Sequence, residues 1–343
     1  MTRYSLLLLA AICGYAQSVV LENGTAKMTW ELAGGSLVGF ELKELPLNPF
    51  TWETPTTKNQ ARARGHFLCL DRWGAPSEAE KTAGMPFHGE ASNVTWRLIG
   101  KTASDAEMAV QLPLARIAVK RTVRLDGSSA VITESVTNEH PLGRVYNMVQ
   151  HPTIGPPFLD ETTVVDSNAR RGFLQSSPMP NPEYPVVVWP QALKDGIPVN
   201  LRYLHDDPNP AVVSFVIDDA YGWVTAFHPA KGLLLGYIWK TSEYPWLNIW
   251  RHVEGGKPFA RGLEFGTTGL HQPYPVLIQK GRILDRPLLA FLDSAETVTR
   301  SWQVFYGKAP AGFAGVAAVR RVGDEWAIVG RGRGEVRGKN LLN

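Results

Sequence analysis

The feature that most constrains the fold of this chain is a series of short apolar or alternating runs, each bounded by Gly, Pro, Asn or Asp. Val, Ile, Thr and aromatic residues dominate these runs, which is typical of β-strands. The sequence Asp126-Gly127 between two of the runs predicts a tight hairpin turn. Only the stretch PSEAEKTAG (76–84) reads as a short helix. We therefore expect an all-β protein, a large antiparallel β-sandwich with few short helices. Typical runs are SLVGFEL (36–42), RIAVKRTVRL (116–125), AVVSFVI (211–217) and LLLGYIW (233–239).

Composition supports a folded protein that does not bind nucleic acid. Hydrophobic residues make up 44% of the 343 residues and charged residues 20%, which is enough apolar material for a large core. The formal net charge of +3 is small and the basic residues are dispersed, so we expect no nucleic-acid partner.

The first 16 residues have the pattern of a secretory signal peptide. Arg3 precedes the apolar run LLLLAAIC, and the small residues Gly14 and Ala16 suit cleavage before Gln17. The run is too short to span a bilayer. We therefore expect a secreted or periplasmic protein with no membrane span. Cleavage would leave Cys69 as the single cysteine, so the mature chain would have no intrachain disulfide.

The remaining chain divides into two parts by composition. Strand-like runs continue through residues 17–308, which we expect to form the β-sandwich domain. A proline-dense stretch at 170–210 is expected to be an irregular excursion on it. Residues 309–343 form a Gly/Arg-rich C-terminal extension that we expect to fray at its end.

Three stretches carry the candidate chemistry: FHGEASN (87–93), VTNEHPLGRVYNMVQHPTIG (136–155) and ARGLEFGTTG (260–269). His151 falls near a strand end, where its side chain can reach a cleft. Glu264 alternates with Leu263 and Phe265, so its carboxylate faces away from them. Burial raises a carboxylate pKa and suits a general base. Each residue alone also has a structural interpretation, such as an ion pair between Glu264 and Arg261.

Aromatic residues gather in YPWLNIWRH (244–252). On a strand, Trp246, Asn248 and Trp250 lie on one face. Indole rings offer flat platforms for the C–H faces of sugars, and they can equally fill a sandwich core.

In this order the motifs resemble the galactose mutarotase, or aldose 1-epimerase, superfamily. RTVRLDGSSAVITESVTNEHP followed by QHP resembles its hairpin and second histidine motif, HG its first histidine motif, and GLEFGT its glutamate strand. NQARARGHF (59–67) is similar to its arginine segment, where Arg62 and Arg64 both remain candidates. The similarity extends from about Val19 to Lys308.

The resemblance implies a galactose mutarotase-like supersandwich whose concave face holds a carbohydrate ligand. It implies an isomerase that interconverts sugar anomers by acid–base ring opening, with no cofactor and no metal. His151 would protonate the ring oxygen and Glu264 would remove the proton of the anomeric hydroxyl group. His88 would bind the sugar, and Glu90, Arg62, Arg64 and Trp250 are further candidates for substrate binding.

Three alternatives stay open. The protein could be a non-catalytic carbohydrate-binding protein, or another carbohydrate enzyme, such as a lyase, on the same scaffold. His88, His151 and Glu264 could also form a zinc site. The segments LDRWGAPSEAEKTAG (70–84) and EYPWLNIWRHVEGG (243–256) are unlike simple mutarotases. They indicate a divergent protein with a different or larger substrate.

Overall fold

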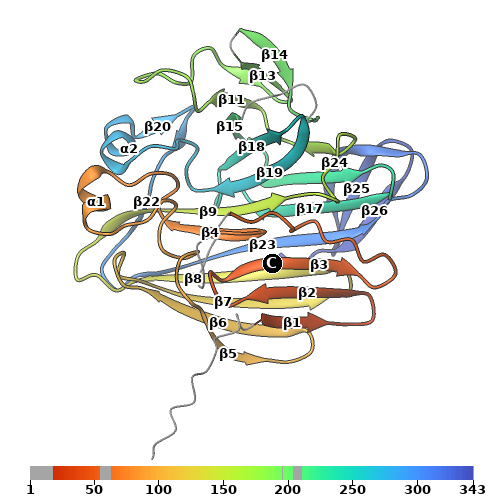
Figure 1. Cartoon of the computed structure of the whole chain (residues 1–343), viewed down its shortest axis with the longest axis horizontal. Coiled ribbons are helices and arrows are strands. Elements are labelled where there is room, and N and C mark those ends of the chain that lie inside the picture. Colours follow the sequence, from red (N-terminus) through yellow and green to blue (C-terminus); the bar gives the residue numbers. More distant parts are fainter. Residues whose placement is uncertain (1–17, 55–62, 195, 204–210, 343) are drawn as a thin grey trace, which may run out of the picture.

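The structure is a computed structural model that describes residues 18–54, 63–194, 196–203 and 211–342. Two large antiparallel sheets pack face to face, and two short helices lie on one side of them (Figure 1). The expected all-β sandwich with few helices is confirmed.

The larger sheet has the strand order β1-β2-β3-β4-β9-β19-β18-β15-β11-β12, with β22 also paired to β9. Its strands are β1 (Ser18–Glu22), β2 (Ala26–Glu31), β3 (Ser36–Leu42), β4 (His66–Asp71), β9 (Arg144–Ile154), β11 (Arg171–Leu174), β12 (Val187–Val188), β15 (Ala211–Val216), β18 (Trp246–Glu254), β19 (Lys257–Gly266) and β22 (Ala290–Leu292).

The second sheet has the order β10-β16-β17-β23-β8-β7-β6-β5. Its strands are β5 (Arg97–Lys101), β6 (Asp105–Leu112), β7 (Ile117–Asp126), β8 (Ser129–Asn138), β10 (Val164–Ser167), β16 (Tyr221–His228), β17 (Leu233–Lys240) and β23 (Thr297–Lys308). Smaller sheets pair β13 (Gln191–Lys194) with β14 (Ile197–Asn200), β20 (Arg282–Ile283) with β21 (Arg286–Pro287), and β24 (Phe313–Val322) with β25 (Glu325–Gly332) and β26 (Glu335–Lys339).

The core fills the space between the two large sheets, and alternation along the strands decides which side chains enter it. On β18 and β19, Leu247, Ile249, Leu263 and Phe265 are all buried in the main apolar cluster. The ring of Phe265 stacks on Trp239 of the second sheet, with centroids 4.3 Å apart. Intervening residues of β18 and β19 therefore face the opposite side of the larger sheet, where the candidate site lies.

The predicted short helix is present as α1 (Glu78–Thr82). Ser77 and Glu80 form a capping box, in which each side chain binds the backbone N–H of the other residue. A second helix, α2 (Tyr274–Lys280), was not predicted. It has seven residues, of which Tyr274 and Leu277 are buried, and this is too short a stretch to show the helical repeat of apolar residues. Both helices lie on the same side of the molecule (Figure 1).

The C-terminal extension is folded rather than frayed, which corrects the expectation for its end. Strands β24–β26 form a meander at the side of the molecule opposite the helices (Figure 1). Phe313 and Trp326 are buried against Trp223 and Phe227 of the second sheet. The indole N–H of Trp326 donates to Gln303 Oε1 at 3.1 Å. Apolar residues spaced among the glycines and arginines supply this small second core.

The predicted signal segment, 1–16, lies outside the described residues, and export stays a prediction. Within the part of the chain that is described, no helix is long and apolar enough to cross a membrane.

We predict that Trp326→Ala lowers the free energy of unfolding by about 3–5 kcal/mol, because a buried indole is lost and a cavity remains. Val322→Ala in the same meander is the control, since Val322 is 46% exposed and should cost less than about 0.5 kcal/mol. Urea unfolding followed by tryptophan fluorescence and by circular dichroism measures both. Equal effects of the two variants would contradict an integral C-terminal meander.

Candidate active site

The centre of the site is a contact between two neighbouring strands. Gly262 of β19 pairs with Thr153 of β9, and Phe265 pairs with Gln150, so Glu264 and His151 stand opposite each other between these pairs. His151 Nε2 lies 3.1 Å from Glu264 Oε1. The two residues are 113 positions apart in sequence, yet the register of one strand pair is enough to bring them together.

Both members of this pair are buried, and burial acts on them in opposite directions. His151 is 5% exposed and Glu264 1% exposed. Desolvation raises the pKa of Glu264 well above its usual value, although a hydrogen bond from Trp73 opposes the shift. Desolvation lowers the pKa of His151 to about 3. Each shift favours the neutral form, so the pair most easily holds one shared proton between the two side chains.

Thr153 and Phe67 orient the His151 ring. Thr153 Oγ1 lies 3.0 Å from His151 Nδ1, so Nε2 is the nitrogen that faces Glu264. Phe67, the cross-strand partner of His151 on β4, stacks on the imidazole with centroids 4.1 Å apart.

His88 is the third predicted residue that reaches this place. Its ring centroid lies 5.4 Å from that of His151. His88 has a left-handed backbone conformation, φ 65°. The Gly74 backbone binds both its ring and its backbone N–H. Gly74 N–H donates to His88 Nδ1 at 3.0 Å, and His88 N–H donates to Gly74 O at 3.0 Å. Because Nδ1 accepts, neutral His88 carries its proton on Nε2 and can donate it to a ligand.

The following Gly89 is needed for close approach of the backbone. It has φ 78° and forms a bridge to Leu70, and a Cβ at this position would collide with the Leu70 carbonyl oxygen. The neighbour that Gly89 admits is therefore the end of β4.

Sequence reasoning missed two site residues, Trp73 and His271. The indole N–H of Trp73 donates to Glu264 Oε2 at 2.8 Å. The His271 ring lies 4.7 Å from the Trp73 ring and 5.5 Å from the His88 ring, and burial lowers the His271 pKa to about 4. Neither residue stands in an alternating, strand-like run of the sequence. The only signal for Trp73 was the unusual segment LDRWG.

Aromatic rings continue from the pair along the sheet. Trp250 is half-buried, 6.3 Å from His151 and 5.5 Å from Trp52 between ring centroids. Trp246, on the same face of β18, is fully buried under α2 beside Tyr274 and Leu277. The predicted shared face is confirmed, and of the two indoles Trp250 is the one left partly accessible beside the pair.

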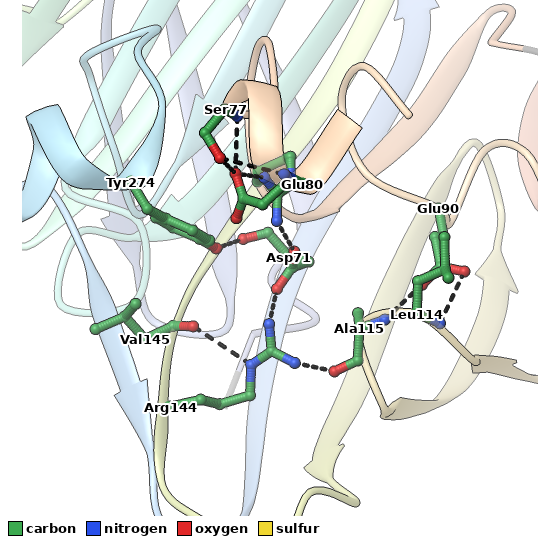
Figure 2. Close-up of polar contacts among 10 residues, drawn as sticks. Asp71, Ser77, Glu80, Glu90, Leu114, Ala115, Arg144, Val145 and Tyr274 are labelled. Atoms are coloured by element: carbon green, nitrogen blue, oxygen red, sulfur yellow. Dashed lines mark hydrogen bonds and ion pairs between the residues drawn. The ribbon is translucent and has the colours of Figure 1, made fainter. Parts of the chain in front are cut away.

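The structure does not bring Glu90 and Arg64 to the pair. The buried Glu90 carboxylate accepts hydrogen bonds from the backbone N–H groups of Leu114 and Ala115 at 3.2 and 2.7 Å, and this contact ties two loops together (Figure 2). Arg64 forms ion pairs with Glu31 and Glu53. Arg62 lies outside the described residues.

Metal coordination was the open alternative for these side chains. In the described segments, no group of three or more His, Cys, Asp or Glu residues is arranged to hold a metal ion. The zinc hypothesis therefore gains no support from the geometry of this part of the chain.

The fold is that of galactose mutarotase-like proteins. A galactose mutarotase related enzyme from Lactobacillus acidophilus superposes with a TM-score of 0.63 at 11% identity, covering 85% of this chain and 98% of that one. A galactose mutarotase-like protein from Lactobacillus casei gives 0.62 at 15% identity, covering 85% and 100%. One from Clostridium acetobutylicum gives 0.63 at 14% identity, covering 85% and 95%. No family model and no curated protein matches the sequence. The predicted resemblance is confirmed at the level of the fold, with low identity throughout.

The histidines predict a specific pH dependence of stability. The His271 pKa is about 4 in the folded protein against an ordinary 6.5, so the unfolded chain binds more protons between these values. The stability that comes from keeping His271 neutral is therefore fully present above pH 6.5 and is lost as the pH falls toward 4. We predict that His271→Gln makes the slope of unfolding free energy against pH shallower in this window. The reduction should be at most the amount that corresponds to one bound proton. Phe87→Leu, which alters a ring contact of His271 without removing a titrating group, should leave the slope unchanged. Urea titrations at a series of pH values measure the slope, and an unchanged slope in His271→Gln would contradict a neutral buried His271.

Proposed function

We propose that the protein is an isomerase of the aldose 1-epimerase type, which interconverts the anomers of a sugar by acid–base ring opening. The observation that carries the proposal is the His151–Glu264 contact of 3.1 Å on an aromatic face of the larger sheet. The ring oxygen and the anomeric hydroxyl are bonded to the same carbon. An acid and a base side by side therefore match two oxygens side by side.

The reaction needs one proton delivered and one removed, and the pair can do both. With the shared proton on His151, the imidazolium donates from Nε2 to the ring oxygen as the C1–O bond breaks. The Glu264 carboxylate accepts the proton of the anomeric hydroxyl, which becomes the aldehyde oxygen. Rotation about C1–C2 and the reverse transfers close the ring as the other anomer. The pair holds one proton throughout, and each transfer contributes roughly 10²–10⁴ in rate.

The surroundings support a role for the other residues in binding. His88 offers an Nε2–H donor beside His151. Trp250 and Phe87, which is 53% exposed, provide apolar rings on which the C–H face of a sugar can rest. In the described residues the side-chain partners of Glu264 are His151 and Trp73. The lyase alternative predicts an extended cleft with a Tyr, Arg or metal near the base.

We predict that Glu264→Gln lowers turnover by at least about 10²-fold and leaves sugar binding largely intact, because the amide keeps the shape and cannot accept the proton. His151→Asn should likewise reduce turnover more than affinity. Polarimetry on freshly dissolved aldoses measures the rate, and isothermal calorimetry measures binding. His140→Asn is the control, because His140 lies in the loop between β8 and β9, where its Nδ1 accepts a hydrogen bond from the Leu142 N–H. Equal acceleration by the wild type and Glu264→Gln would rule out Glu264 as the base.

The aromatic platform also suits a non-catalytic carbohydrate-binding protein, and a second variant separates the two functions. We predict that Trp250→Ala weakens sugar affinity by about 1–3 kcal/mol through loss of apolar contact. An enzyme loses turnover in Glu264→Gln as well, whereas a binding protein accelerates no sugar and responds only to Trp250→Ala. Unchanged affinity in Trp250→Ala would contradict the platform.

A further inference from the structure

The segment Asp71–Gly74 begins at the last residue of β4 and lies against the catalytic pair. Asp71 ends the strand with φ 80°, a left-handed conformation that is unusual for a residue other than glycine. Two residues later Trp73, which is 2% exposed, donates its indole N–H to Glu264 Oε2. The carboxylate thus has one oxygen on His151 and the other on Trp73, which fixes its plane.

A buried network anchors this turn (Figure 2). The Asp71 carboxylate binds Arg72 at 2.6 Å and also binds Arg144 of β9, while the Tyr274 hydroxyl donates to the Asp71 carbonyl oxygen. Arg72 also pairs with Glu80 of α1 at 2.7 Å. The end of β4 is therefore tied to β9, α1 and α2 at once. Such a network can hold the strained Asp71 backbone and, with it, the direction of Trp73.

The next residue, Gly74, shows how closely this segment is fitted to the site. A Cβ at Gly74 would lie 2.9 Å from the His271 ring, and its backbone N–H orients His88. One short stretch therefore contacts Glu264, His271 and His88.

We propose that Trp73 is a positioning residue for the catalytic base: its indole N–H holds the Glu264 carboxylate toward His151 and stabilises its ionised form. The role of Glu264 as base rests on the proposed function, while the effect of Trp73 on Glu264 does not. An indole is a donor only, so it binds a carboxylate more strongly than a neutral carboxyl group. This hydrogen bond lowers the Glu264 pKa and counters the burial that raises it.

Ionisation of Glu264 can be followed without any substrate. In protein labelled with ¹⁵N-tryptophan and ¹³Cδ-glutamate, the Trp73 indole N–H signal should titrate with the same midpoint as the Glu264 carboxyl carbon. Trp73→Phe and Glu264→Gln assign the two signals by their loss. Trp246 is the matched control, because its indole N–H donates at the same 2.8 Å to the carbonyl oxygen of Pro287, which has no proton to exchange. Its signal should not share this titration.

In Trp73→Phe we expect the proton affinity of Glu264 to rise about tenfold, the effect of one hydrogen bond to a charged group. If the protein is an epimerase, the acid limb of the pH profile of kcat/KM moves to higher pH by about one unit, which corresponds to this tenfold change. A purely structural loss would not move it. An unchanged Glu264 midpoint in folded Trp73→Phe, or a Trp73 signal that does not follow Glu264 in the wild type, overturns the proposal. A raised midpoint in a protein that accelerates no sugar supports the role of Trp73 and counts against the proposed function.

Discussion

The register of β9 is the constraint on which the site depends. Successive residues of this strand point to opposite faces, so a slip by one residue would turn His151 into the core. Gln150 opposes such a slip from the other face. Its side chain donates to Glu134 Oε2 at 2.5 Å and to the Tyr244 hydroxyl at 3.2 Å, and its Oε1 lies 3.2 Å from His66 Nε2. These buried polar groups would lose their partners in any other register, which would be costly. The polar interior thus aligns the strand that presents His151 on the outer face.

Burial then gives the aligned residues their chemistry. A carboxylate and an imidazole in water would each hold or release protons independently near their ordinary pKa values. Away from water, separate charges are disfavoured on both, and a single proton shared between them becomes the favoured arrangement. The indole of Trp73 favours the carboxylate form, which returns part of the basic character that burial removes. Strand register, burial and one neutral donor together produce a pair that can accept and donate a proton at adjacent atoms.

Alternation and motif order in the sequence were sufficient to predict the sandwich, the hairpin at Asp126-Gly127, and the meeting of His88, His151 and Glu264. The sandwich and the hairpin depend on strand periodicity and turn residues, which are local. The meeting of the three residues was instead what the resemblance of the motifs, in their order, to the galactose mutarotase superfamily implied. Other features depend on long-range contacts that no local pattern encodes. Trp73 reaches Glu264 across 191 positions, and Glu90 finds its partners at the turn before β7. The C-terminal meander was misjudged because its glycines and arginines dominate the composition, while the few residues that bury it, such as Trp326, are widely spaced.

The central claim is that His151 and Glu264, side by side, act on the two oxygens of one sugar carbon. A crystal structure of Glu264→Gln soaked with an aldose that the wild type binds tests this most directly, because the substitution preserves the shape of the site and stops turnover. The account predicts the ring oxygen within hydrogen-bond distance of His151 Nε2, the anomeric hydroxyl on the side chain at position 264, and a sugar face against Trp250. A sugar bound elsewhere on the sandwich, or bound here with its anomeric carbon directed away from the pair, would contradict it.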